Sequence, residues 1–472
     1  MSKKKLLKKK NGLNKDLVVV QGLGFVGSAM AVAVASKRDK NNEPRFNVTG
    51  IDLPNIEGEK RINSINSGKF PFKTNDNMLS SELSKAVKFG NLNATTAKNI
   101  LSDANVVLVS INCDLIKQND EYKIDIDPFI NSLKDVALNI SENTLVIIES
   151  TVPPGTCEKI VYPLFIDVFQ KRNLNINKLY LAHSYERVMP GNEYYNSIIN
   201  YWRVYAGINQ ESSDKCEAFF SKIVNTKDYP LTCLSSTISS ETSKLLENSF
   251  RAVNIAFIEE WGRFAEDIKV DLFEIIKAIR MRPTHSNLRQ PGFGVGGYCL
   301  TKDPLFAKIS ARDILQLNDH DFPFSTKAVQ VNAAMPLVTL EKIKNYFKGS
   351  LKGIKILIMG VTYKQEVGDT RFSPSETFAK EAKAQGAVIS AHDTMIKYWN
   401  EMEMDVKNNL PESSNFNAIL FAVPHAEYQD IILNKWIENS NILIFDANNV
   451  LTKKQISEIK ENKLHYMSIG RG

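Results

Sequence analysis

The sequence predicts an α/β protein with two Rossmann-like, doubly wound domains joined by a central helical domain that contains one long helix. Short apolar runs alternate with glycine turns and helical segments near both ends of the chain. Several of these runs are apolar without interruption, which is typical of strands buried on both faces of a parallel sheet. Between the two sets, from Ser239 to about Ile268, apolar residues recur at helical spacing.

The chain length and these patterns predict four segments. A chain of 472 residues is long enough for roughly two to four domains. We expect a disordered basic tail over residues 1–15, a Rossmann domain over 16–215, a central helical domain over 216–335 and a second Rossmann-like domain over 336–472.

Composition and charge exclude several classes of function. Hydrophobic residues make up 43% and charged residues 24%, and no apolar run approaches the ~18 residues that span a bilayer, so we expect no membrane partner. The net charge is +6, but six lysines lie in the first ten residues. A nucleic-acid binder would need basic residues beyond this tail, so we expect no nucleic-acid partner.

The five cysteines form no CxxC pair, and their odd number argues against a disulfide framework or a zinc site. We therefore predict no metal site and a cytoplasmic location.

The first Rossmann unit begins with the apolar strand Leu17–Val20. A turn with GxGxxG spacing and a helical run follow it, which places a pyrophosphate at the helix N-terminus. The predicted cofactor-binding residues of this turn are Gly22, Gly24, Phe25, Val26 and Gly27.

The next strand, 46–51, ends at Asp52. A carboxylate there accepts hydrogen bonds from both ribose hydroxyls, which favours NAD over NADP. The alternative is a glycine-rich turn with a capping aspartate.

Three further strands are predicted at 106–110, 144–149 and 179–182. The second runs into a turn that starts at Ser150, where Thr151 is expected to face the cleft unless it only forms a structural turn. The third opens into Glu186 and Arg187, for which a surface ion pair is the competing interpretation. His183 has no neighbouring histidine, so we expect a structural role.

The long helix is expected to be capped by Ser239 or Ser240, with Glu241 in its first turn. Its apolar positions are Leu245, Ala252, Ala256, Phe257, Phe264 and Ala265. Lys244 and Asn248 stand four residues apart and therefore share a face, so an ammonium and an amide could converge on one oxyanion. A solvent-facing pair is the alternative.

The glycine-rich segment 291–304 organises the rest of the chain. Its glycines let the backbone approach a ligand, and Cys299 stands at its end. Lys302 and Asp303 follow and are expected to favour a thiolate, which would serve covalent catalysis. A buried cysteine in a tight turn is the alternative.

The second α/β unit is predicted from strands at 355–360, 387–391, 417–423 and 441–447 and a helix at 373–385. It lacks the full glycine fingerprint, so it either binds another nucleotide or closes the cleft. Lys364 and Arg371 lie between its first strand and helix and are available to a phosphate or carboxylate.

Taken in order, these motifs resemble the UDP-glucose/GDP-mannose dehydrogenase family of NAD-dependent nucleotide-sugar 6-dehydrogenases, from Leu17 to Gly472. The matching blocks are GLGFVG, Asp52, INSG at 65–68, STVPPGT at 150–156, the Glu186 motif, the helix of Lys244 and Asn248, GFGVGGYCLTKDP at 292–304 and GVTYKQEVGDTRFSPS at 360–375.

The resemblance implies that a sugar C6 alcohol is oxidised twice with two NAD. Cys299 would attack the aldehyde to give a thiohemiacetal, which is oxidised to a thioester and hydrolysed to the uronate. Lys244 and Asn248 would stabilise the oxyanion, and Asp303 would activate the water.

The resemblance also implies roles for the remaining site residues. Thr151 would hold a water near the reacting carbon, and Glu186 would be the acid/base. Thr151 and Lys302 would also contact NAD. The second Rossmann-like domain would bind the UDP-sugar. The expected substrate-binding residues are Glu186, Arg187, Val188, Lys244, Asn248, Gly294, Gly296, Lys364 and Arg371.

The residues after Glu186 distinguish branches of the family. Here they read Arg187-Val188-Met189-Pro190-Gly191, and this ERVxPG form is typical of enzymes acting on UDP-ManNAc or UDP-GlcNAc. The alternative is a UDP-glucose 6-dehydrogenase, and a more distant one is a non-catalytic nucleotide-sugar-binding protein. A two-electron hydroxyacid dehydrogenase would need no loop cysteine.

The family also implies that the long helix forms a dimer interface, so a homodimer or higher oligomer is expected. The likeness further implies a role in supplying a uronic acid for a cell-surface polysaccharide.

Overall fold

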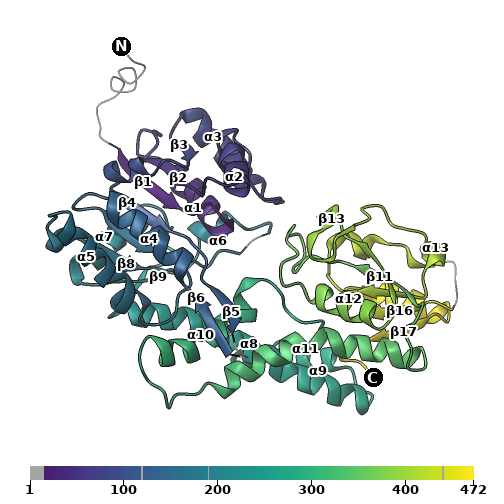
Figure 1. The fold of residues 1–472 in the computed structure, drawn as a ribbon. Coiled ribbons are helices and arrows are strands. Elements are labelled where there is room, and N and C mark those ends of the chain that lie inside the picture. Colours follow the sequence, from purple (N-terminus) through teal and green to yellow (C-terminus); the bar gives the residue numbers. More distant parts are fainter. Residues whose placement is uncertain (1–14, 119–120, 190, 438–440) are drawn as a thin grey trace.

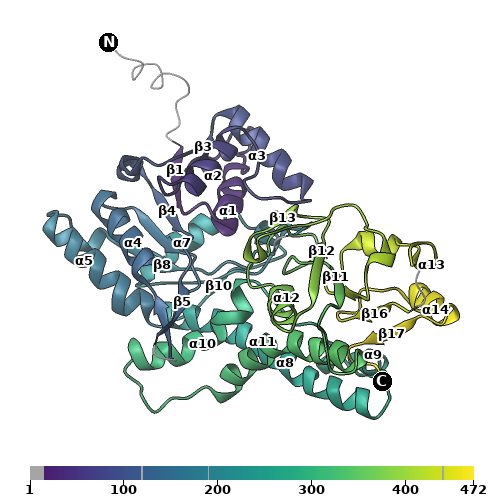
Figure 2. The ribbon, with the colours of Figure 1, turned by 45° about the vertical axis from the view of Figure 1, so that its right-hand side comes forward.

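The computed structural model describes residues 15–118, 121–189, 191–437 and 441–472 (Figure 1). Residues 1–14 of the predicted tail and Pro190 lie outside the described residues. Two α/β lobes stand side by side above a layer of long helices, and Figure 2 shows the same arrangement from a second side. No described helix is both long and apolar enough to cross a membrane.

The first lobe is built on an eight-stranded sheet of order β10-β9-β8-β7-β4-β1-β2-β3. All neighbouring strands are parallel except β8 and β9, which are antiparallel. The strands are β1 Asp16–Gln21, β2 Phe46–Ile51, β3 Leu92–Thr95, β4 Val106–Val109, β7 Leu145–Ile148, β8 Tyr180–His183, β9 Val204–Gly207 and β10 Thr232–Cys233. The doubly wound fold is thereby confirmed.

Helices cover both faces of this sheet because its central strands are apolar on both sides. Val18 and Val20 of β1 pack in one core with α1 and α3, whereas Val19 packs in the other with α4 and α5. The helices are α1 Phe25–Ala35, α2 Ile56–Asn66, α3 Asn77–Phe89, α4 Asp127–Asn139, α5 Tyr162–Lys171, α6 Asn196–Ile199 and α7 Gln210–Phe220. A hairpin of β5 Asp114–Gln118 and β6 Glu121–Asp125 reaches down to α10.

The central layer contains α8 Thr237–Asp267, α9 Leu272–Arg280, α10 Tyr298–Asp313 and α11 Pro323–Tyr346. The helix α8 packs against α10 and α11. It begins earlier than predicted, because Ser236 is its extended N-cap and the Ser236 hydroxyl accepts a hydrogen bond from the Ser239 N–H at 3.1 Å. The predicted cap at Ser239 or Ser240 is therefore wrong, since the Ser240 hydroxyl bonds His183 Nδ1 at 2.8 Å instead.

The apolar residues of α8 lie on two sides of the helix. Leu245, Ala252, Ala256 and Ala265 are buried, as a helix packed on its neighbours requires. The two phenylalanines in the predicted apolar set are half exposed, and both lie on the other side of the helix.

The second lobe is a five-stranded parallel sheet of order β12-β11-β15-β16-β17. Its strands are β11 Lys355–Met359, β12 Val388–His392, β15 Ala418–Phe421, β16 Leu443–Asp446 and β17 His465–Ser468, with a small pair of β13 Tyr398–Trp399 and β14 Met404–Asp405. Its helices are α12 Pro374–Ala384, α13 Leu433–Trp436 and α14 Lys453–Glu461.

The two lobes touch through a segment between α2 and α3. Lys73 of this segment donates hydrogen bonds to the carbonyl oxygens of Thr394 at 3.2 Å and Met395 at 2.9 Å. The Asn75 amide donates to Glu366 at 2.9 Å. These contacts bring the carboxyl ends of both sheets to one cleft.

Candidate active site

A cavity of about 640 Å³ lies where the first lobe, the cysteine loop and the second lobe meet. Its walls include the ends of β1, β2, β4 and β7, the start of α10, and the segment between β11 and α12. Ligands bind at such strand ends in doubly wound sheets. The predicted site residues that line it are Gly22, Gly24, Phe25, Val26, Asp52, Thr151, Glu186, Val188, Cys299, Lys302, Asp303 and Arg371.

The glycine turn after β1 is shaped to receive a phosphate group. Gly22 has φ +94°, and a Cβ there would meet the Ser110 carbonyl oxygen at 2.6 Å, so only glycine fits. A Cβ at Gly27 would collide with the Gly22 carbonyl oxygen, whereas Gly24 has open space around it. The first turn of α1 has no side-chain cap, so its N–H groups are available to a pyrophosphate.

Asp52 ends the second strand as predicted and is almost fully buried. Its two oxygens are held by Arg61 of α2, from Nε at 2.7 Å and from a terminal nitrogen at 3.1 Å. The backbone N–H of Leu53 donates a third hydrogen bond at 2.8 Å. These donors orient the carboxylate at the cavity wall, where it fits the ribose hydroxyls of NAD.

The turn that carries Thr151 is anchored from the long helix. The buried Glu241 carboxylate accepts hydrogen bonds from the backbone N–H groups of Gly155 at 2.6 Å and Cys157 at 2.8 Å. Burial raises the pKa of Glu241 to about 7, against the opposing effect of these hydrogen bonds. Thr151 is thus positioned at the cavity by α8.

A second buried pair supports the same wall. Glu149 follows β7 and is paired with Arg203, whose Nε also donates to the Ser184 hydroxyl at 3.0 Å. Burial raises the pKa of Glu149, and Arg203 opposes that shift. Removing either partner alone would leave an uncompensated buried charge, which typically costs about 3–5 kcal/mol.

Glu186 and Lys244 form the next part of the site. The Lys244 ammonium lies 3.7 Å from the Glu186 carboxylate and donates to the Glu186 carbonyl oxygen at 3.0 Å. The Glu186 carboxylate also accepts from the Val188 N–H. Burial opposes the charge of Lys244, but Glu186, Cys299 and Asp303 outweigh it and raise the Lys244 pKa.

Asn248 and Lys302 both hold Asp303. The Asn248 amide donates to one Asp303 oxygen at 2.8 Å, and the Lys302 ammonium lies 3.2 Å from the other. Lys302 also donates to the Cys113 carbonyl oxygen at 2.7 Å. The carboxylate of Asp303 is buried, so these contacts compensate its charge.

Cys299 lies in the first turn of α10 and is open to the cavity. The enclosing walls desolvate its sulfur, and together with Asp303 they raise the thiol pKa to about 11, although Lys244 opposes them. Of the two residues that were expected to favour a thiolate, Lys302 lowers the thiol pKa as expected, whereas Asp303 raises it. Lys302 contacts Asp303 and a carbonyl oxygen, and the nearby carboxylate disfavours a second negative charge.

Other predicted residues lie outside the cavity wall. Arg187 pairs with Glu247 at 3.1 Å and donates to the Tyr185 hydroxyl at 3.1 Å, so it forms the ion pair that was the competing interpretation. Gly294 and Gly296 face protein, since an added Cβ would meet the Asn332 and Phe372 carbonyl oxygens. These glycines allow the cysteine loop to pack closely.

Arg371 lies where three parts of the chain meet. Its guanidinium pairs with Asp369 at 2.6 Å and stands 5.4 Å from the Phe25 ring and 4.6 Å from the Tyr298 ring. Because it reaches the cavity from the second lobe, it joins the glycine turn to the cysteine loop.

His183 has the structural role that was expected. Its ring is fully buried, and burial lowers its pKa to about 3, so it is neutral at physiological pH.

Several residues of this site were missed from the sequence, among them Arg61, Glu149, Arg203 and Glu241. Glu149, Arg203 and Glu241 act through partners far along the chain, and no local motif marks them. Only the opposite charges near Asp52 offered a signal, since Arg61 lies on the helix that follows this strand.

Comparison with known proteins agrees with this geometry. Three models of the UDP-glucose/GDP-mannose dehydrogenase family match the chain in order: the NAD binding domain over residues 16–224, the central domain over 238–334 and the UDP binding domain over 357–453. NAD as the cofactor is thereby confirmed, in accord with the glycine turn and Asp52.

Similar proteins cover nearly the whole chain. UDP-N-acetyl-D-mannosamine dehydrogenase of Methanocaldococcus jannaschii is 30% identical over 450 residues, which is 94% of this chain and 95% of that protein. The Pyrococcus horikoshii protein of the same name is 26% identical over 461 residues, or 96% of this chain and 99% of that protein.

Solved structures show the same arrangement. UDP-D-ManNAc dehydrogenase from Pyrococcus horikoshii has a TM-score of 0.80 at 25% identity, covering 97% of this chain and 99% of that chain. A UDP-glucose dehydrogenase from Pyrobaculum islandicum also has a TM-score of 0.80, at 19% identity over 98% of this chain and 100% of its own, and shows the fold alone. The chain belongs to the UDP-glucose/GDP-mannose dehydrogenase family and is an NAD-dependent oxidoreductase that dehydrogenates a UDP-sugar.

Proposed function

We propose that this protein oxidises the C6 alcohol of a UDP-N-acetylhexosamine, UDP-ManNAc or UDP-GlcNAc, to the uronate through a thioester on Cys299. The observation that carries the proposal is the convergence of the Cys299 thiol, the Lys302 ammonium and the Glu186 and Asp303 carboxylates on one cavity beside the glycine turn. The Lys244 ammonium lies behind this wall, 3.7 Å from the Glu186 carboxylate. The Arg187-Val188 sequence after Glu186 and the relatives named UDP-N-acetyl-D-mannosamine dehydrogenase favour the N-acetylated sugars.

In the first oxidation Glu186 accepts the proton of the C6 hydroxyl, and Thr151 holds a water near C6. NAD, when bound, accepts a hydride in each of the two oxidations. Lys244 lies close enough to Glu186 to stabilise the alkoxide that forms as the proton leaves.

The thiol of Cys299 then adds to the aldehyde. A bond forms between Sγ and C6, the C=O π pair moves to oxygen, and the thiol proton ends on that oxygen. Because the thiol pKa is about 11, the proton must leave sulfur as the new bond forms, and Lys244 and Asn248 stabilise the developing oxyanion.

The second oxidation removes the hydroxyl proton and a hydride from C6 and leaves a thioester. Asp303 accepts a proton from the water that adds to the thioester, the C–S bond breaks, and sulfur recovers a proton. Asp303 is positioned for this step by Asn248 at 2.8 Å and Lys302 at 3.2 Å.

A group of cations supports binding of the substrate phosphates. Burial and the neighbouring Arg251 and Arg280 lower the pKa of Arg289, and partial desolvation and Arg251 lower the pKa of Lys364. The Arg371 guanidinium lines the cavity, and Lys364 lies on the same segment between β11 and α12. We assign Lys364 and Arg371 to the pyrophosphate.

The test is NADH formation with UDP-ManNAc, UDP-GlcNAc, UDP-glucose and GDP-mannose in parallel, counted per sugar consumed. We expect two NADH per sugar with one of the N-acetylated substrates. Activity with UDP-glucose alone would support the alternative of a UDP-glucose 6-dehydrogenase and end the branch assignment. One NADH per sugar would contradict the covalent mechanism, and no turnover with any of the four would favour a non-catalytic binding protein.

We also propose that the protein forms a homodimer through α8. One side of α8 exposes large apolar side chains from Leu246 to the C-cap Ile268, which is unusual for a face turned to water. These residues are Leu246, Phe250, Phe257, Trp261, Phe264 and Ile268, each at least 49% exposed.

Replacing Trp261 and Phe264 together with glutamate is expected to convert the dimer to a monomer, because two charges would be buried without partners. Sedimentation velocity measures the mass directly. Phe89→Glu, at an exposed position of the first lobe, is the matched control and should stay dimeric. A wild-type monomer, or a double variant that remains dimeric, would contradict the proposed interface.

A further inference from the structure

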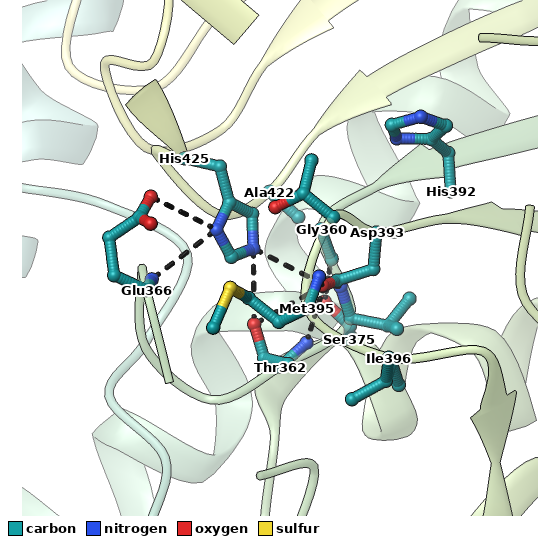
Figure 3. Close-up of polar contacts among 12 residues, drawn as sticks. Gly360, Thr362, Glu366, Ser375, His392, Asp393, Met395, Ile396, Ala422 and His425 are labelled. Carbon is teal, nitrogen blue, oxygen red and sulfur yellow. Dashed lines mark hydrogen bonds and ion pairs between the residues drawn. The ribbon is translucent and has the colours of Figure 1, made fainter. Parts of the chain in front are cut away.

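The second lobe holds a buried cluster of charged side chains that the mechanism above does not use (Figure 3). His425 lies at its centre, and the side chains of His425 and Asp393 are both fully buried. Glu366 lies on the other side of the ring and is mostly buried, with 19% of its side chain exposed. The three residues follow β15, β12 and β11 respectively, so they meet at the carboxyl end of the second sheet.

Asp393 fixes the start of the segment 361–371. One of its oxygens accepts hydrogen bonds from the Val361 N–H at 2.8 Å, the Thr362 N–H at 3.1 Å and the Thr362 hydroxyl at 3.2 Å. The other accepts from the Met395 N–H at 2.8 Å. The same segment ends at Arg371 in the cavity, so the position of that guanidinium depends on this anchor.

His425 joins the two carboxylates, as Figure 3 shows. Its Nε2 lies 3.2 Å from Asp393 and 3.1 Å from the Thr362 hydroxyl. Its Nδ1 lies 3.6 Å from the Glu366 carboxylate and accepts a hydrogen bond from the Glu366 N–H at 3.3 Å. A neutral ring therefore donates to Asp393 and accepts from the Glu366 N–H, whereas a protonated ring can donate to both carboxylates but gives up the bond from that N–H.

Both contacts from the first lobe end on groups that this cluster organises. Asn75 donates to Glu366, the carboxylate beside His425 Nδ1. Lys73 donates to the Thr394 and Met395 carbonyl oxygens, next to the N–H that Asp393 holds. Between them and the cavity, Phe72 stacks on Phe25 with ring centroids 3.9 Å apart. The cluster therefore connects the contacts between the two lobes to the cavity wall.

We propose that His425 is a positioning residue. By bridging Asp393 and Glu366 it holds the segment 361–371, with its contact to Asn75, and the neighbouring carbonyl groups that Lys73 binds, in the arrangement that binds the UDP-sugar. The proposal rests on the proposed function, in which Lys364 and Arg371 contact the substrate phosphates. His425 itself lies outside the cavity and acts through the segment that it anchors.

The charges around His425 determine how its role depends on pH. Burial opposes protonation of His425, but the hydrogen bond and charge of Asp393, with the charges of Glu366 and Glu427, raise its pKa. Burial and the nearby His425 lower the pKa of His392. Burial alone would raise the Asp393 pKa, but the hydrogen bond from His425 and the charge of His425 lower it. Since the His425 pKa is raised on folding, the bridge is complete below the unfolded value of about 6.5 and is lost as pH rises through the folded value.

The experiment measures UDP binding by calorimetry, at about pH 6 and about pH 9, for the full-length wild type and for His425→Gln. Loss of a charged hydrogen bond should weaken UDP binding by about tenfold. We therefore expect the wild type to bind UDP about tenfold more weakly at the higher pH than at the lower pH. We expect His425→Gln to bind UDP weakly at both pH values. His465→Gln, at an exposed histidine of the same lobe, is the matched control. Its binding at the two pH values measures the part of the pH dependence that comes from titration of UDP itself. We also expect His425→Gln to raise KM more than it changes kcat.

Two further measurements keep the test independent of folding and of substrate. Glu366→Gln leaves the Asp393 side of the bridge intact and should flatten the pH dependence without unfolding the lobe. Hydrogen exchange of the ligand-free protein should be faster over 361–371 and 67–76 in His425→Gln. Exchange and pH dependence identical to the His465→Gln control would overturn the proposal. Faster exchange with no UDP binding by the wild type would instead overturn the proposed function.

Discussion

Replacing Cys299 with alanine is expected to lower uronate formation by roughly 10⁴-fold or more, the order that loss of a covalent nucleophile costs in well-studied enzymes. No other thiol is placed to substitute, because Cys113 is buried and burial raises its pKa to about 12. The first oxidation needs no nucleophile, so a single NADH per enzyme-bound sugar should still form. Rapid-mixing absorbance at the NADH band, with product analysis, separates the two oxidations.

The reactivity of the same thiol provides a second measurement. Alkylation of Cys299 by iodoacetamide, followed by mass spectrometry, should accelerate as pH rises toward the thiol pKa of about 11. Cys233→Ala, at an exposed cysteine of β10, is the control and should keep full activity. Uronate formation by Cys299→Ala at the wild-type rate would rule out the thioester.

Replacing Lys244 with glutamine is expected to lower kcat by about 10²–10³-fold, as loss of one oxyanion donor does in other enzymes. Glutamine keeps a hydrogen-bond donor but removes the charge that faces Glu186 and Cys299. Because Lys244 lowers the thiol pKa, the alkylation profile of Cys299 should also move to higher pH in this variant.

The matched control for Lys244 is Lys308→Gln on α10, whose ammonium pairs with Asp321 at the surface. This change should leave both kcat and the alkylation profile unaltered, since surface ion pairs contribute little. If Lys244→Gln kept the wild-type kcat, stabilisation of the oxyanion would have to come from other donors.

Much of the fold could be predicted from the sequence because its signals are local. The apolar runs of β1, β4 and β7 correspond closely to the observed strands, since a strand buried on both faces has little room for polar residues. The boundaries were less certain where neighbouring residues could serve equally well. Ser236, Ser239 and Ser240 can each cap a helix, and the contact of Ser240 with His183 decides among them.

The candidate site divides in the same way. The residue types that carry the chemistry could be predicted from the sequence, because a glycine turn, a thiol and the Lys244 and Asn248 pair are recognisable over a few positions. It did not reveal Arg61, which orients Asp52, or Glu241, which anchors the Thr151 turn. Neither contact is marked by a motif, and Glu241 lies 86 and 84 residues along the chain from the Gly155 and Cys157 N–H groups that it binds.

The ionisation of the site and the contacts between the lobes could not be predicted from local sequence and depend on the folded structure. Lys302 and Asp303 follow Cys299 in sequence and suggested a thiolate, yet desolvation and the Asp303 charge raise the thiol pKa. No motif in the sequence marks His425, which the fold places between two carboxylates. The physical reason is that sequence determines which groups are present, whereas burial and the distance between charges set their protonation, and both arise only when the chain has folded.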